Sequence, residues 1–241
     1  SSSIRQRTQA NVTFKARESL SEQIAGHLAA QIIRGDMLAG DRIQELRVAG
    51  ELEVSRGSVR EALLILERRH LIDILPRRGA VVKEMSESQV RGLYELVQVL
   101  LGLVIRKAIK NVREDDLDPI IALIHELQVA ASDRDLERFF DLSFQFLEHA
   151  YPFARNGFVE DVLTDLHPAL QRTYFMALHL DNDEMKECLS FFKALVETIF
   201  RRDVRSALEI IREFAEHQSE LVQESITRAR QIEAAWGGRR K

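Results

Sequence analysis

The sequence predicts a mainly α-helical chain in two parts, a small N-terminal domain of three helices and a basic hairpin, followed by an all-α helical bundle. Two observations predict this class. Apolar residues recur at helical spacing from Leu20 to Ile32 and again over most of the chain after Ser86. Only two short runs, 71–75 and 80–82, have the composition of β-strands, and four turn-forming residues join them.

The composition is that of a packed protein and excludes several classes. The chain has 241 residues, enough for two domains, with 45% hydrophobic and 30% charged residues, which argues against long disordered tracts. Its single cysteine, Cys188, cannot form an internal disulfide. The longest uncharged apolar run, Leu96 to Ile105, has about half the length of a membrane span. We therefore expect a soluble, cytoplasmic protein without a membrane partner.

The elements of the first part follow one another in a recognisable order. Helical stripes cover residues 18–34 and about Glu45 to Leu52, and a third helix begins at Ser55, a good N-cap. The hairpin after that helix is basic, because the segment from Arg56 to Lys83 holds 7 basic and 3 acidic residues. This order predicts a winged helix-turn-helix over residues 15–84, preceded by an N-terminal arm, residues 1–14.

The third helix and the hairpin supply the candidate contacts to double-stranded DNA. Exposed arginines on a helix more often only solvate a surface, but here the domain context favours DNA. Arg56 and Arg60, four residues apart, project together from the turn that enters the major groove, where arginine pairs with guanine or phosphate. Serine hydroxyls and backbone N–H groups at a helix start suit phosphate oxygens, and a basic wing suits the backbone or minor groove. The candidate DNA-binding residues are Arg47, Ser55, Arg56, Gly57, Ser58, Arg60, Arg77, Arg78 and Gly79.

The remainder of the chain is predicted to be helical throughout. Ser86 to Gln89 is a capping box that opens a helix to about Lys110. Further helical patterns cover roughly 116–131, 133–150, 156–180, 183–201 and 203–230. We expect one all-helical domain over residues 86–235, which binds an effector and dimerises.

The N-terminal residues resemble the DNA-binding domain of the GntR family. The resemblance covers about residues 18–83 and rests on the runs Gly40–Glu45, Val54–Leu63 and Arg77–Val82. The departures are small: Glu53 stands where the family usually has Gly, Ser58 where Pro is common, and Leu46 where a phosphate-contacting Arg is frequent. The resemblance implies a transcription factor, most often a repressor, that binds a palindromic operator as a homodimer.

The helical part resembles, more loosely, the effector-binding FCD domain of the FadR subfamily. Many members bind a divalent metal through an Asp, a His four residues later, and two further His on the last two helices. Asp141 matches the Asp, but Gln145, Phe192 and Phe214 stand at the three histidine positions, and phenylalanine cannot ligate a metal. The resemblance therefore implies no metal and no cofactor for this chain.

Two interpretations of these replacements stay open. Either the bulky side chains fill a core, or a polar pocket has become apolar and takes a hydrophobic effector, since pockets match the polarity of their ligands. Members that bind fatty acyl-CoA also lack the metal ligands, which favours the second interpretation. Such an effector would shift the helical domain against the linker near Met85 and Ser86. The candidate effector-binding residues are Val97, Leu101, Asp141, Gln145, Arg172, Phe192 and Phe214, with Asp141, Gln145 and Arg172 as orienting polar groups.

No pattern of catalytic residues appears, so we predict a regulator and not an enzyme. The sequence has no Gly-x-Ser-x-Gly motif, phosphate-binding loop or dinucleotide fingerprint, and His125-Glu126 lacks the second His of a zinc-protease helix. His217, one turn beyond Phe214, remains open as a metal ligand. Two alternative functions remain: a small-molecule binding or carrier protein, and a regulator of the same family that responds to a metal-bound organic acid.

Overall fold

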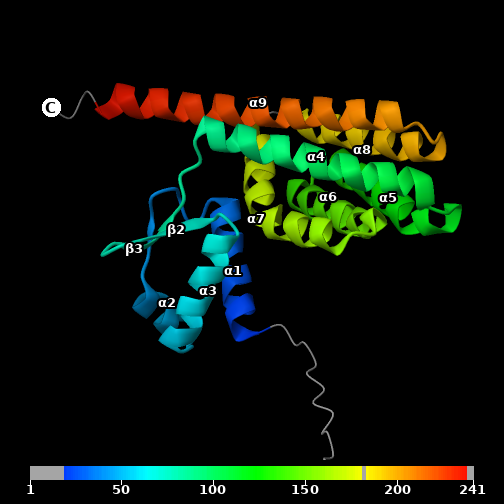
Figure 1. Cartoon of the computed structure of the whole chain (residues 1–241). Helices are drawn as coiled ribbons and strands as arrows, with labels where there is room; N and C mark the ends of the chain where they lie inside the picture. Colours follow the sequence, from blue (N-terminus) through cyan, green and yellow to red (C-terminus); the bar gives the residue numbers. More distant parts are fainter. Residues whose placement is uncertain (1–18, 181–182, 238–241) are drawn as a thin grey trace, which may run out of the picture.

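A computed structural model describes residues 19–180 and 183–237 of the chain. It confirms the mainly α fold, with a winged helix-turn-helix followed by a helical domain (Figure 1). The predicted N-terminal arm, residues 1–14, lies outside the described residues. The elements of the first part are α1 (Leu20–Arg34), β1 (Arg42–Ile43), α2 (Glu45–Leu52), α3 (Arg56–Arg68), β2 (Ile72–Leu75) and β3 (Gly79–Val82).

Local hydrogen bonds explain where the helices of the first part begin and end. Ser19 caps α1 by accepting from the backbone N–H of Glu22, and α1 ends at Gly35 with φ +80°. The side chain of Ser55 caps α3 in the same way, as the sequence predicts. Between α2 and α3 the chain turns through Glu53 at φ 54°, a left-handed conformation that glycine adopts more readily.

The wing is a small antiparallel sheet in the order β1-β3-β2. Strands β2 and β3 pair with Ile72 opposite Val82 and form the hairpin that projects from the domain in Figure 1. Strand β1 pairs with β3, with Arg42 opposite Val81. Strand β1 is not predicted from the sequence, because a strand of two residues has no alternating pattern.

The second part is helical throughout the described residues. Its α4 begins at the predicted capping box, with the side chains of Ser86 and Gln89 bonded to each other's backbone N–H. Two short 3-10 helices, η1 and η2, were not predicted from the sequence. No helix of the described residues is long and apolar enough to cross a membrane. Its elements are α4 (Glu87–Asn111), η1 (Glu114–Leu117), α5 (Asp118–Asp133), α6 (Leu136–Ala150), η2 (Tyr151–Ala154), α7 (Gly157–Leu180), α8 (Glu184–Phe200) and α9 (Val204–Gly237).

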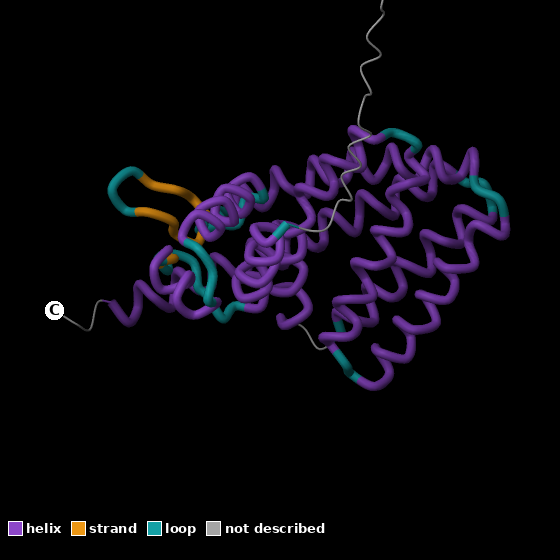
Figure 2. Tube along the Cα trace, turned by 90° about the horizontal axis from the view of Figure 1, so that it is seen from below, coloured by secondary structure: helices purple, strands orange, loops and turns teal. Residues whose placement is uncertain are grey.

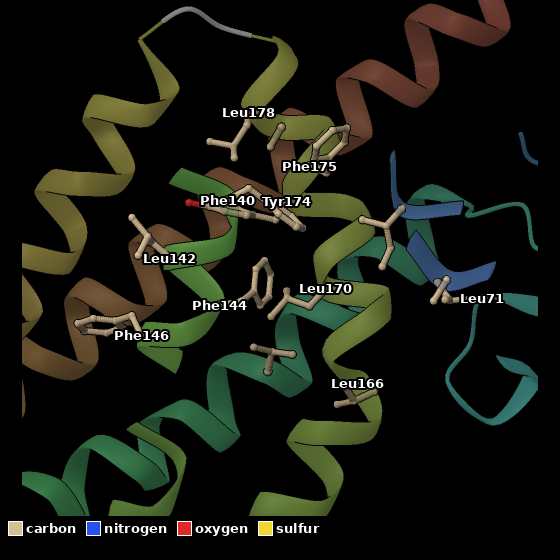
Figure 3. Packing of buried hydrophobic residues seen from close by; sticks show 14 of the residues in the cluster. Leu71, Phe140, Leu142, Phe144, Phe146, Leu166, Leu170, Tyr174, Phe175 and Leu178 are labelled. Carbon is tan, nitrogen blue, oxygen red and sulfur yellow. The ribbon is translucent and has the colours of Figure 1, made fainter. Parts of the chain in front are cut away.

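The helices pack in an arrangement that brings the two parts of the chain together. Helices α4 and α9 run antiparallel along one side of the molecule (Figure 1). The winged domain lies at one end of the helical domain (Figures 1 and 2). Helix α7 lies between the helical domain and the winged domain, and it packs against α1. Aromatic rings of α6 and α7 fill the interior, where Phe140 meets Phe175 edge-on at 5.3 Å and Phe144 lies beside Leu170 and Tyr174 (Figure 3).

Candidate DNA interface and effector cavity

The recognition surface of α3 is exposed and carries two arginines held by one carboxylate. The side chains of Arg56 and Arg60 both turn toward Glu45 of α2, with Nη2 to Oε2 distances of 3.8 and 3.0 Å. The hydrogen bond from Arg60 lowers the pKa of Glu45 from its ordinary value. Both guanidinium groups therefore lie beside Glu45 in the first two turns of α3. This role of Glu45 was not predicted, because an acidic residue in the first turn of a helix is common for other reasons.

The other predicted contacts of the helix-turn-helix lie around the start of α3. The hydroxyls of Ser55 and Ser58 are 2.8 Å apart, and Ser55 accepts from the backbone N–H of Ser58. Gly57, between them, is exposed. Arg47 is exposed on α2 and pairs with Glu51 one turn later at 2.7 Å. The two serines and Gly57 lie together at the N-terminus of α3, and Arg47 lies on the preceding helix, α2.

The tip of the wing presents its basic residues to solvent. Arg77 and Arg78 are exposed, and Gly79 has φ +76°, which a side chain would strain. Arg42 of β1 donates through Nη2 to the backbone carbonyl of Arg78 at 2.7 Å. This contact braces the hairpin turn from the neighbouring strand. The contact of Arg42 with the hairpin was not predicted, because no pattern around this residue predicted a strand.

A cavity of about 50 Å³ lies inside the helical domain, with walls from α4, α6, α7, α8 and α9. Four of the predicted effector residues line it together, and their side chains make it almost wholly apolar: Val97, Leu101, Phe192 and Phe214. The ring of Phe191, on α8, stacks on Phe214 at 3.8 Å with an angle of 11° between the ring planes.

The other three predicted effector residues lie elsewhere, so the structure differs here from the sequence-based placement. Asp141 and Gln145 face outward, because α6 turns its phenylalanines into the core and these two share the opposite face. Asp141 lies 3.8 Å from Arg34 of α1, and partial burial raises its pKa while Arg34 counteracts the rise. The guanidinium of Arg172 points to the linker and not to the cavity.

The residues at the resembled metal positions do not fit a metal ion. Phe192 and Phe214 have no ligating atom, and the outward-facing Asp141 and Gln145 do not line the cavity with them. His217 lies 3.0 Å from the carboxylate of Glu184 and meets no further ligand. Within 19–180 and 183–237, no three His, Cys, Asp or Glu side chains come together as a metal would require.

Helix α7 connects the cavity to the DNA-binding part. Leu170 and Tyr174 line the cavity, while Arg172, between them in sequence, donates through Nη1 to the backbone carbonyl of Lys83 at 2.7 Å. Arg172 is only 8% exposed, and burial lowers its pKa. Lys83 directly follows wing strand β3, and its own N–H bonds to the carbonyl of Leu71. A shift of α7 at the cavity would therefore act directly on the end of the wing.

Comparisons with known proteins agree with this architecture. Residues 20–82 match the family described as bacterial regulatory proteins, gntR family, and residues 92–217 match the FCD domain. The HTH-type transcriptional repressor RspR of Escherichia coli strain K12 is 27% identical over 232 residues, 95% of this chain and 96% of that protein. The gluconate operon transcriptional repressor of Bacillus subtilis strain 168 is 24% identical over 176 residues, covering 71% of this chain and 70% of that one.

A solved structure shares the fold over most of the chain. The structure of E. coli McbR/YncC superposes with a TM-score of 0.75 at 20% identity and covers 87% of this chain and 100% of that one. Both named relatives are transcriptional repressors, and both matched domains are domains of transcriptional regulators and not of enzymes. The chain belongs to the gntR family of bacterial regulatory proteins, and it is a transcriptional regulator with an FCD domain at its C-terminal end.

Proposed function

We propose that this regulator is a homodimeric repressor that binds a palindromic operator and changes its affinity when a small apolar effector enters the cavity of the helical domain. The observation that carries the proposal is helix α7, which lines the cavity through Leu170 and Tyr174 and holds the linker through Arg172. Repression is supported by the two relatives that are named repressors, at 27% and 24% identity.

The DNA contacts of the proposal divide into two kinds. Arg56 and Arg60 at the start of α3 read bases in the major groove, because the fork of an arginine pairs with two acceptors of guanine. Around the same helix start, the hydroxyls and N–H groups of residues 55–58, together with Arg47, bind phosphates. The wing residues, Arg77 to Gly79, contact the DNA backbone or the minor groove. Phosphate contacts set affinity and base contacts set sequence preference.

A dimer is needed because one recognition helix reads too few base pairs to select a site. We place its interface on the face shared by α4 and α9. There, Val99 is 68% exposed although its side chain is apolar. A groove of about 880 Å³ lies beside Val99 between the two helices. An isologous contact through this face gives the two-fold symmetry that a palindrome requires.

Two domains take part in the response. We assign DNA binding to residues 15–84 and effector binding and dimerisation to residues 86–235.

The cavity is too small to admit an effector without a change in its walls. Its volume of about 50 Å³ is below the volume of about 150 Å³ that holds benzene in an engineered cavity, so an effector must displace wall side chains. Movement of α7 then shifts the linker and the spacing of the two recognition helices. Such coupling changes affinity roughly 5- to 150-fold.

Selection of duplex DNA from a random pool by the full chain tests this function. The proposal predicts enrichment of a palindrome whose half-sites lie about 10 base pairs apart, or a multiple of that spacing. Binding of the selected duplex should fall steeply as salt rises, because phosphate contacts release counterions. A pool without enrichment, or binding that does not change with salt concentration, would contradict the proposal. Such a result would favour the alternative of a small-molecule binding or carrier protein.

A further inference from the structure

One residue of the cavity lining, Gln218, has a buried polar atom, Oε1, that finds no hydrogen-bond partner among the described residues. Gln218 is 0% exposed and lines the cavity from α9, one turn after Phe214. A buried carboxamide oxygen that lacks a partner is unfavourable in a folded protein and is rare enough to need an explanation. A ligand that donates to this oxygen would supply the missing bond.

The carboxylate of Glu184 fixes the orientation of this carboxamide. Nε2 of Gln218 donates to Oε1 of Glu184, which is itself almost fully buried. The same carboxylate accepts from Sγ of Cys188 at 3.4 Å and pairs with Nε2 of His217 at 3.0 Å. Reversing the carboxamide would set its oxygen against a carboxylate oxygen. The carboxamide atom that lacks a partner is therefore an acceptor.

The other buried polar groups of the wall have used their hydrogens. The hydroxyl of Ser143 donates to a backbone carbonyl four residues earlier, so it accepts from Tyr174 at 3.1 Å. The hydroxyl of Thr173 donates to a carbonyl three residues earlier, so it accepts from the cavity-lining Tyr94 at 2.9 Å. Gln98, the remaining amide of the lining, is partly exposed and has access to water. Among the described residues, the fully buried polar groups of the lining thus offer a ligand one acceptor and no donor.

Charge in and around the cavity disfavours an anion. No Lys, Arg or His belongs to the lining that the described residues form, and the carboxylate of Glu184 stands directly behind Gln218. Transfer of an anion into such a site would lack any compensating partner. The stacked rings of Phe191 and Phe214 are both partly exposed, so they form the part of the wall that has room to move when a ligand enters.

We propose that the cavity binds an uncharged, largely apolar molecule that carries one hydrogen-bond donor, such as the hydroxyl of an alcohol or phenol, and that this donor bonds to Oε1 of Gln218. The inference rests on the proposed function, because it names the effector class of the same cavity. A thioester has no donor at its carbonyl end, so the wall favours a different class from the acyl-CoA type that the family resemblance implies.

Calorimetric titration of the full chain with phenol, toluene and benzoate tests the ligand class. Phenol and toluene have the same shape and differ in a hydroxyl against a methyl group. Phenol should bind roughly five- to tenfold more tightly than toluene, the effect of about one hydrogen bond, and benzoate should not compete. In Gln218→Leu the preference for phenol should vanish. In the control Gln223→Leu, on α9 but outside the cavity lining, it should persist.

Equal affinity for phenol and toluene, tighter binding of benzoate, or no binding of phenol would overturn the proposal. The comparison in the wild-type chain decides this even if Gln218→Leu fails to fold. Operator affinity measured with the same probes separates the inference from the proposed function. Phenol that binds through Gln218 without changing operator affinity supports the ligand class and contradicts the effector role. Phenol and toluene that release the operator equally support the effector role and overturn the donor requirement.

Discussion

Arg60 of the recognition helix is hydrogen-bonded to Glu45 of the preceding helix, with Nη2 3.0 Å from Oε2. Arg56 approaches the same carboxylate at 3.8 Å. Both arginines are exposed, and exposed ion pairs contribute little to stability because water screens them. Each arginine can therefore exchange Glu45 for a base or a phosphate at small cost. The ion pairs with Glu45 therefore do not prevent either arginine from contacting DNA.

Arg60→Ala should weaken binding of the selected operator and relax its base preference. The expected loss is roughly 5- to 150-fold, the effect of one bidentate contact to guanine. Fluorescence anisotropy with the operator and with duplexes changed at single positions measures both effects. Arg138→Ala removes an exposed, ion-paired arginine on α6 and serves as the control. If Arg60→Ala binds like this control, the assigned base contact is wrong.

Arg78→Ala should weaken binding to all duplexes alike. Its side chain lies at the exposed tip of the wing, where we assign it to a phosphate and not to a base. The slope of log affinity against log salt should become shallower by about 1, since one fewer counterion is released. A change in base preference with an unchanged salt slope would instead assign Arg78 to direct base reading in the minor groove.

Arg172→Met should uncouple the helical domain from the wing. The variant keeps most of the side-chain volume but leaves the Lys83 carbonyl without this donor, so stability should fall by roughly 1–3 kcal/mol. Operator affinity should fall roughly 5- to 150-fold, because the linker no longer has a fixed position relative to α7. Thermal unfolding and operator titration measure the two effects separately.

The matched control for this variant is Arg202→Met. Arg202 also donates to backbone carbonyls, those of Ile109 and Val112, but both lie inside the helical domain. Its loss should lower stability and leave operator affinity unchanged once folded protein is compared. Equal effects of the two variants on operator affinity would remove the special role of Arg172.

Val99→Glu should dissociate the dimer. The substitution places two like charges at a two-fold interface on the α4 and α9 face, and dissociation should become at least about tenfold easier. Sedimentation velocity over a range of protein concentrations reports the change. Val129→Glu, at an apolar position on α5 with 48% exposure, is the control and should remain dimeric. A dimeric Val99→Glu would move the interface to another face.

Stability should fall on acidification through His167. Burial lowers the pKa of His167 to about 4 from 6.5, and its Nε2 has no hydrogen-bond partner among the described residues. Glu148 lies 3.8 Å from Nδ1 but is largely exposed, so burial dominates. Because the folded pKa is lowered, the unfolded chain binds the proton first as pH drops. The free energy of unfolding therefore contains a contribution from neutral His167 that is fully present above pH 6.5. This contribution is lost as the pH falls from about 6.5 to about 4, and the total loss is about 3 kcal/mol.

Urea unfolding at pH 7 and at pH 4.5 measures this loss. His167→Phe keeps a ring against Phe144 and removes the titrating nitrogens. The variant should lose less stability than wild type over this interval, while other titrating groups contribute equally to both chains. Parallel losses in the two proteins would show that His167 is protonated or solvated in the fold.

Much of the fold follows from local signals in the sequence. The caps Ser19, Ser55 and Ser86 begin helices where their side chains satisfy free N–H groups, and such signals act over only a few residues. The hairpin strands follow from their apolar residues and the turn at Gly79. Strand β1 does not, because its pairing with β3 is a contact between segments about 40 residues apart.

The cavity was predicted only in its apolar part. Phe192 and Phe214 meet there because each lies on the inward stripe of its helix. Asp141 was placed there by resemblance, whereas burial of the neighbouring phenylalanines turns it outward to Arg34. The partnership of Glu184 with Gln218 joins α8 to α9, and no local pattern in either helix signals it.

Native mass spectrometry of the chain with its selected duplex tests the central claim most directly. A dimeric regulator that reads a palindrome should give one duplex with two chains, and a duplex with one half-site scrambled should bind at least about tenfold more weakly. A complex of one chain per duplex, with unchanged affinity after scrambling, would contradict the account.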